Sequence, residues 1–250
     1  MELDALSIII LMSAGVFAGF LNTVAGGGSL LTLPIMIFMG LPSNVANASN
    51  RVAIFSQNLF SVAGFRSKGI SAFPYAFWLA GTAIVGSIIG AQFAMDIKGE
   101  VFNRILAIIM IVVLLLTIFK PGVKTGQSEK MGPKDKIIGA ITFFFIGIYG
   151  GFIQAGVGFI IIAALTNINA LSMAKTNSIK VFVVLIYTIS ALGVFIYQDM
   201  INWTYGLTLA VGNSAGGWIA SRWSADKDDK WIRIILIVTV SVMAIRLWFF

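Results

Sequence analysis

A run of three glycines at positions 26–28 interrupts a long apolar stretch near the N-terminus of this chain. Each glycine in a helix costs about 1 kcal/mol relative to alanine, so the run predicts a break in a helix. In lipid, the backbone groups freed by such a break must be surrounded by protein or by a water-filled cavity. Close packing of helices through small residues is the simpler explanation. Polar residues flank this run at Asn22, Thr23 and Ser29, and a related interruption follows later, so we favour a functional break.

The composition indicates a membrane protein with several spans. Of the 250 residues, 58% are hydrophobic and only 11% are charged, whereas soluble domains carry about 25% charged residues. The net charge of +7 fits basic loops on the cytoplasmic side of a membrane. We therefore expect one multi-pass membrane domain over residues 1–250. Its expected surroundings are the lipid bilayer, and nucleic acid is not an expected partner.

Two residue types are absent from the sequence, cysteine and histidine. Their absence removes thiol nucleophiles, imidazole acid–base chemistry and the usual zinc ligands. All ten acidic residues are expected at the termini or in loops, so no carboxylate is expected inside the membrane. We therefore predict no cofactor, no metal site and no catalytic residue, and an intramembrane enzyme is the least favoured function.

The spacing of apolar segments and turn residues predicts an all-α fold with about eight hydrophobic segments. The first half is expected to form helices over residues 5–21, 29–40, 45–65, 70–95 and 101–119. A polar linker over residues 120–136 follows and contains five lysines.

The second half repeats features of the first at an offset of roughly 127–132 residues. The matched segments are Gly151-Phe152-Ile153-Gln154 with Gly19-Phe20-Leu21-Asn22, Thr176-Asn177 with Ser49-Asn50, and Gly216-Gly217 with Gly86-Ser87. These matches keep their order along the chain, which favours a true duplication over chance similarity between apolar sequences. We predict one repeat over about 5–119 and a second over about 137–250.

The two repeats could have the same or opposite orientations in the membrane. A helix needs about 20 residues to span the hydrocarbon core, so the segment 29–40 is too short and can form a re-entrant hairpin with the helix before it. Three full spans per repeat would then invert the second repeat. This arrangement places most basic residues on one side of the membrane, as the positive-inside rule requires. These are Arg66, Lys68, the five linker lysines, Arg222, Lys227 and Lys230. We favour inverted repeats with both termini outside and the linker in the cytoplasm.

Inverted repeats with broken helices are typical of secondary transporters that bind their substrate near the bilayer midplane. The short segments that start near Gly28 and Gly158 would direct helix N-termini, which attract anions, to the membrane centre. Arg51 and Lys180 lie inside the helices that follow. A buried cation needs a counter-charge, which a bound anion could supply, unless the side chain extends to the interface. The predicted binding residues are Asn22, Thr23, Gly26, Gly27, Gly28, Ser29, Asn50, Arg51, Gln154, Gly156, Gly158, Asn177 and Lys180.

The first break also resembles a known motif. Residues 19–34, GFLNTVAGGGSLLTLP, resemble the glycine-rich first motif of the TauE/SafE sulfite exporter family, and residues 46–51 resemble the start of its next helix. Length, duplication and glycine motifs extend the resemblance over nearly the whole chain. The resemblance implies an inner-membrane permease for sulfite, sulfonates or related small anions. The second break, at residues 154–159, departs from the full glycine triplet.

The expected function is therefore secondary transport of small anions by alternating access. An anion channel is the main alternative, and an intramembrane enzyme is the weaker one. The expected partners are a small anionic substrate and the lipid bilayer, and assembly into a homo-oligomer is compatible with the sequence.

Overall fold

The computed structural model describes residues 3–70, 73–95, 97–118 and 129–223. Within these ranges every regular element is an α-helix, which confirms the predicted all-α class. Residues 120–128 of the predicted linker, the last segment of the second repeat after residue 223, and Asp96 lie outside the described residues. The helices are α1 (Ala5–Val24), α2 (Ser29–Phe38), α3 (Ser43–Ser67), α4 (Tyr75–Met95), α5 (Gly99–Ile118), α6 (Pro133–Phe152), α7 (Val157–Asn169), α8 (Met173–Tyr197) and α9 (Trp203–Trp223).

Local sequence signals explain where several helices begin. The Asp4 carboxylate accepts a hydrogen bond from the Ser7 amide at 2.9 Å and caps the start of α1. α6 begins with Pro133, which has no amide hydrogen to donate. A helix needs no hydrogen-bond donor at its first position, so proline is tolerated there. Of the described helices, four are long and apolar enough to cross a membrane: α1, α4, α6 and α8. The chain is therefore a membrane-embedded helical protein.

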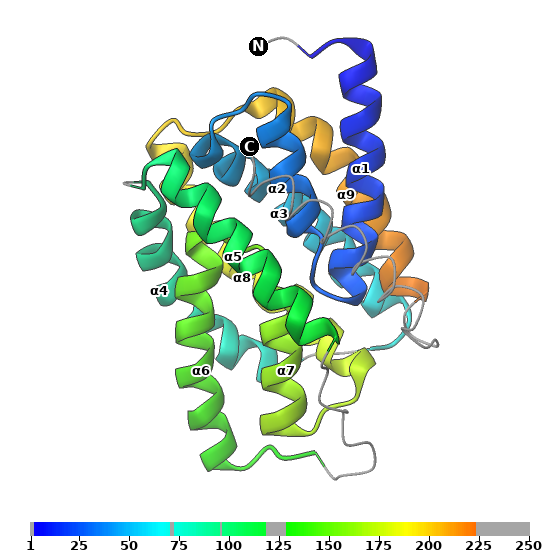
Figure 1. Cartoon of the computed structure of the whole chain (residues 1–250). Helices are drawn as coiled ribbons and strands as arrows, with labels where there is room; N and C mark the ends of the chain where they lie inside the picture. The colour runs from blue at the N-terminus through cyan, green and yellow to red at the C-terminus, as the bar shows by residue number, and fades with distance from the viewer. Residues whose placement is uncertain (1–2, 71–72, 96, 119–128, 224–250) are drawn as a thin grey trace.

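The helices of the two predicted repeats run in opposite directions. In Figure 1, α1 runs downward while α6 runs upward, and the following helices of the two repeats are reversed in the same way. Three helix pairs match at both ends: α1 with α6 and α4 with α9 at an offset of 128 residues, and α3 with α8 at an offset of 130. This arrangement supports the inverted repeats that the charge distribution predicts.

The proposed alignment of Thr176-Asn177 with Ser49-Asn50 is wrong by three residues. At the 130-residue shift that superposes α3 and α8, Asn177 corresponds to Asn47 and Lys180 corresponds to Asn50. The helix before α8 is three residues longer than its counterpart α2, so like residues at the two helix starts are not equivalent. At this shift Arg51 corresponds to Val181, one residue after Lys180.

Each repeat packs its first helix against the fourth helix of the other repeat. Glycines face each other along both contacts, α1 against α9 and α6 against α4. A Cβ added at Gly216 of α9 would overlap the Val16 carbonyl of α1, and one added at Gly90 of α4 would overlap the Ile148 carbonyl of α6. Small residues let these helix backbones approach closely, which is the main source of attraction between helices in lipid.

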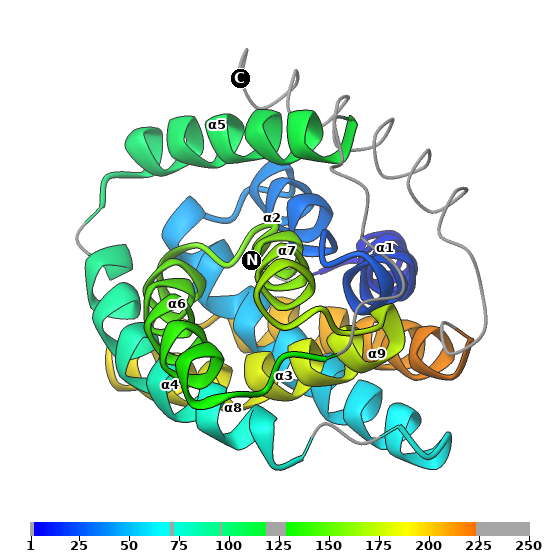
Figure 2. The same cartoon turned by 90° about the horizontal axis from the view of Figure 1, so that it is seen from below.

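The first two helices of each repeat form a hairpin that turns inside the protein. In Figure 1, α2 returns toward the end of the bundle where α1 begins, and α7 returns toward the opposite end, where α6 begins. In Figure 2, α7 and α2 lie inside the arc formed by the longer helices α1, α9, α8, α4 and α6. Both breaks are therefore enclosed by protein, as backbone interruptions within a membrane must be.

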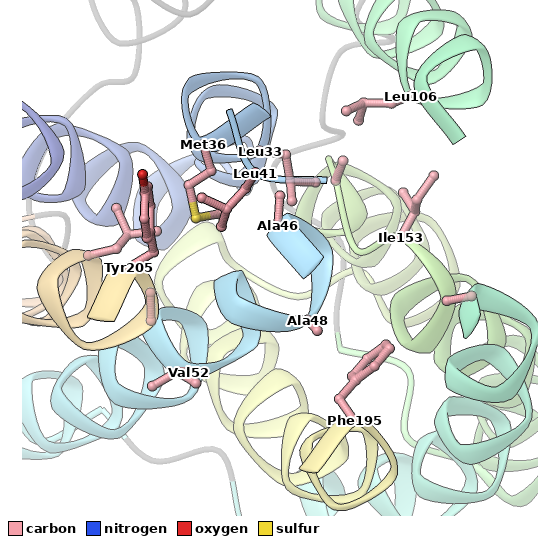
Figure 3. Packing of buried hydrophobic residues seen from close by; sticks show 14 of the residues in the cluster. Leu33, Met36, Leu41, Ala46, Ala48, Val52, Leu106, Ile153, Phe195 and Tyr205 are labelled. Carbon is pink, nitrogen blue, oxygen red and sulfur yellow. The ribbon is translucent and has the colours of Figure 1, made fainter. Parts of the chain in front are cut away.

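A buried apolar cluster holds the first hairpin in place. It joins Leu33 and Met36 of α2 to Ala46 of α3 and Leu106 of α5. Figure 3 shows Phe195 of α8 pointing toward α3 from the other side. The N-terminal half of α3 is thereby fixed between α2 and α8, which sets the depth of the polar residues that α3 carries.

The charges predict which end of the bundle faces the cytoplasm. The C-terminal ends of α3 and α9 and the N-terminal end of α6 carry basic residues and share one end of the bundle in Figure 1. We expect Lys134→Cys to react with a membrane-impermeant maleimide only after the cells are permeabilised, and Leu3→Cys to react in intact cells. No native cysteine interferes. The reverse labelling pattern would contradict this topology.

Candidate functional site

Arg51 is fully buried in the third turn of α3 and contacts the C-terminal end of α6. Its Nη1 donates to the Gly150 carbonyl and to Gln154 Oε1. Its Nη2 donates to the Gly151 carbonyl at 2.9 Å and to Asn47 Oδ1 at 3.3 Å. The last carbonyls of a helix lack intrahelical partners and carry partial negative charge. The guanidinium therefore caps a helix that ends inside the membrane.

The guanidinium also lies against an aromatic ring. Its central carbon is 5.5 Å from the centre of the Phe195 ring of α8, within the range of a cation–π contact. All of these partners of Arg51 are neutral. Every acidic residue in the described ranges lies at a helix end or in a loop: Asp4, Glu100, Glu129, Asp135 and Asp199. The charge of Arg51 is therefore held by dipoles and not by a carboxylate.

Lys180 plays the corresponding part at the other break. It lies in α8 with 2% of its surface exposed, and its Nζ donates to the Thr23 carbonyl and to Asn177 Oδ1, both at 2.8 Å. Thr23 lies in the last turn of α1. A cation from each repeat thus contacts the end of the broken helix of the other repeat. Lys175, earlier on α8, instead lies at the surface and pairs with Glu129 at 2.6 Å.

The first break is stabilised by a chain of side-chain hydrogen bonds. Asn22 Nδ2 donates to Gln57 Oε1 at 3.0 Å, and Gln57 Nε2 donates to Thr23 Oγ1 at 3.3 Å. The Thr23 hydroxyl also lies 2.9 Å from that of Ser61. Gln57 and Ser61 come from α3, so this helix supports the end of α1 along two turns.

Glycines allow the two breaks to touch. Gly26 has a positive φ of 88° and packs directly on Gly158, because a Cβ on either residue would overlap the backbone of the other. Gly28 precedes α2, and a Cβ there would lie 2.6 Å from the Asn22 Cβ. The buried Gly27 accepts a hydrogen bond from the Leu30 amide at 3.1 Å.

The second break uses a different backbone path. Gln154 and Gly156 both have positive φ values, 62° and 71°, and Gly156 directly precedes α7. The Tyr149 hydroxyl donates to the Ala155 carbonyl inside this turn. A positive φ is strained for a residue with a side chain, and at Gln154 it accompanies the hydrogen bond from Arg51.

The structure brings most of the predicted residues together, in three groups. Gly26 and Gly158 form the contact between the breaks. Arg51 and Gln154 are bonded beside the end of α6, with Gly156 in the same turn. The third group is Asn22, Thr23, Asn177 and Lys180 at the end of α1.

Two predicted residues make other contacts. Asn50 accepts a hydrogen bond from Thr32 Oγ1 at 2.8 Å and so holds α2 against α3. Ser29 is buried at the start of α2.

The sequence analysis missed Asn47 and Tyr187. Asn47 lies four residues before Arg51, a spacing that places both on one face of a helix, so this residue could have been found. Tyr187 is fully buried in α8, and it gives no such signal because it lies within an apolar run.

Comparison with known proteins gives one family and several relatives. Residues 11–247 match the model of the family described as "Sulfite exporter TauE/SafE". A probable membrane transporter protein, ORF9, of a Sinorhizobium species is 24% identical, over 95% of this chain and 90% of its own length. The probable membrane transporter protein YfcA of Escherichia coli K12 is 27% identical, over 95% and 88% of the two chains. A probable membrane transporter protein of Haemophilus influenzae is 21% identical, over 96% and 94%. No solved structure matches.

Proposed function

Since this chain belongs to the sulfite exporter TauE/SafE family, a membrane transporter family and not one of enzymes, we propose that it carries small anions across the cell membrane by alternating access. Sulfite and sulfonates are the proposed substrates, bound beside the helix breaks. The names of the relatives support membrane transport and go no further than that.

The observation that carries the proposal is the buried charge of Arg51. This side chain is inaccessible to solvent and is surrounded by neutral oxygen atoms and a phenyl ring. Neutral dipoles offset only part of the cost of removing a charge from water, and buried charges within membranes are typical of ion and substrate pathways. An anion held next to Arg51 would supply the remaining compensation.

The helix directions add positive potential at the same place. Both α2 and α7 begin at the breaks, so their N-termini, with partial positive charge, point into the protein from opposite sides. Discontinuous helices whose N-termini face an anionic group at the midplane are a recurring feature of secondary transporters. The inverted repeats also supply two related conformations, each opening the site to one side.

The proposal is tested by reconstituting the purified protein in liposomes and measuring the uptake of sulfite. We expect saturable uptake that needs no ATP, and a thermal stabilisation of about 2.7 kcal/mol when sulfite reaches a hundredfold excess over its Kd. Flux that rises linearly with concentration and carries current would indicate an anion channel instead. Neither uptake nor stabilisation with sulfite or methanesulfonate would refute the proposal.

A further inference from the structure

We infer that the substrate anion is bound at the second break only, by hydrogen-bond donors from Arg51, Gln154 and Tyr187, and that these donors select fully ionised oxyanions. This inference rests on the proposed function and specifies its binding site. It differs from the expectation that the glycine triplet of the first break forms half of the site.

Three buried donors at the second break have no hydrogen-bond partner among the described residues. They are Arg51 Nε, Gln154 Nε2 and Tyr187 Oη. All three residues are at least nine-tenths buried, with exposed fractions of 0%, 2% and 0%. Nearly all buried polar groups in proteins are hydrogen-bonded, so an unpaired donor needs an explanation. Three unpaired donors in one place are explained together by one ligand that accepts hydrogen bonds.

The three donors are close to one another. Arg51 donates to the side chain of Gln154 and to the carbonyl of Gly150. A Cβ on Gly150 would lie only 2.8 Å from Tyr187 Oη, so Gly150 joins the two side chains and leaves room for the hydroxyl. Side chains from α3, α8 and the second break therefore converge beside the end of α6.

The first break shows the opposite situation, although Gly26 and not Asn22 is the counterpart of Gln154 at the 128-residue offset of α1 and α6. Gln57 of α3 corresponds to Tyr187 at the 130-residue shift, and Asn22 lies in the last turn of α1. Both belong to the hydrogen-bonded chain with Thr23 and Ser61. None of these four residues has a buried polar atom without a partner. The polar side chains of the first break are thus all paired within the protein, whereas the second break has hydrogen-bond donors without a partner.

Other buried atoms without a partner do not extend this cluster. They are Thr176 Oγ1, Thr188 Oγ1 and Asn213 Oδ1. Both threonines lie on α8, and a threonine within a helix can donate to a carbonyl of its own helix after a change of side-chain rotamer. Asn213 Oδ1 is an acceptor on α9, the helix that packs against α1, so it offers nothing to an anion.

The chemistry of the cluster indicates which anions it selects. A guanidinium, an amide NH2 and a hydroxyl can all donate at once to an oxyanion with several acceptor oxygens. Of the three unpaired groups only the Tyr187 hydroxyl can also accept a hydrogen bond, so the other two require ligand oxygens that carry no proton. A site of donors rejects a ligand whose polar group is left unpaired. The sulfonate group has no proton at neutral pH, whereas inorganic phosphate always retains at least one.

The test compares Tyr187→Phe with Tyr205→Phe. The first variant removes one unpaired hydroxyl and keeps the ring. Tyr205, on α9, is also buried, but its hydroxyl lies 3.5 Å from the Met39 carbonyl, away from the second break. We expect Tyr187→Phe to raise the Kd for methanesulfonate about tenfold, measured by ligand-induced thermal shift, without lowering the melting temperature of the anion-free protein. Tyr205→Phe should retain the wild-type Kd.

The wild-type protein should also bind methanesulfonate at least tenfold more tightly than inorganic phosphate at neutral pH. An unchanged Kd in Tyr187→Phe, in a protein whose Arg51→Gln variant is impaired, would overturn the inference and leave the proposed function standing. Equal affinities for methanesulfonate and phosphate would overturn the claimed selectivity. If the wild-type protein binds neither anion nor sulfite, the proposed function is refuted, and this inference with it.

Discussion

Replacement of Arg51 by glutamine is expected to abolish measurable sulfite flux and to weaken sulfite binding roughly ten- to a hundredfold. Loss of a hydrogen bond that involves a charged group costs about 1.5–3 kcal/mol, which corresponds to this range of Kd values. Glutamine is too short to reach the carbonyls of Gly150 and Gly151 that Arg51 now contacts. The melting temperature should therefore fall as well, because the end of α6 loses its cap.

Arg66→Gln is the matched control for this variant. Arg66 lies on the same helix, α3, but in its last turn at the surface, so its loss should change neither sulfite affinity nor flux. Arg51→Lys separates charge from geometry, because lysine keeps the charge but cannot serve all four acceptors of Arg51 at once. Wild-type flux and affinity in a well-folded Arg51→Gln protein would show that this arginine has only a structural role.

Gly158→Ala is expected to stop transport and to lower the melting temperature. Gly158 is the second residue of α7, where alanine by itself would stabilise the helix by at most about 1 kcal/mol. A Cβ here would overlap the Gly26 backbone, however, and overpacking of this kind typically costs about 1–3 kcal/mol. Because the obstacle is backbone and not a flexible side chain, we expect the unfavourable effect to exceed the favourable one.

Gly193→Ala provides the control for the helix propensity alone. Gly193 lies in α8, and a Cβ there would meet nothing within 4 Å. Its replacement should leave flux unchanged and should raise the melting temperature slightly. Flux and thermal unfolding of the two variants, measured side by side, isolate the contact between the breaks. A Gly158→Ala protein that transports normally and melts higher than the wild type would show that the contact is dispensable.

Much of the fold could be predicted from local features of the sequence. The glycine run at positions 26–28 gave the position of the first break, and the helix that follows is only ten residues long, too short to cross a membrane. The five helices of the first repeat lie close to their predicted ranges, with the largest difference at α4, which begins at Tyr75 and not at residue 70. Such features are local, because they depend on backbone freedom and on the length of apolar segments.

The partners of the buried charges could not be predicted in the same way. Because no carboxylate was expected near Arg51, the expected counter-charge was a bound anion, unless the side chain extended to the interface. The structure shows that oxygen atoms about 100 residues away, at Gly150, Gly151 and Gln154, already accept from both of its terminal nitrogens. Every residue has a backbone carbonyl, so the residue type does not show which carbonyls are free to accept a hydrogen bond. That depends on where α6 ends in the folded structure. Tyr187 could not be predicted either, because what sets its hydroxyl apart is that Gly150 faces it in the folded structure.

The exchange of helices between the repeats has a consequence for biosynthesis. When the ribosome has completed the first repeat, Gly15 of α1 and Gly86 of α4 still lack the helices that cover them, α9 and α6. Neither half can then reach its final packing alone, so assembly must wait until the second repeat has entered the bilayer.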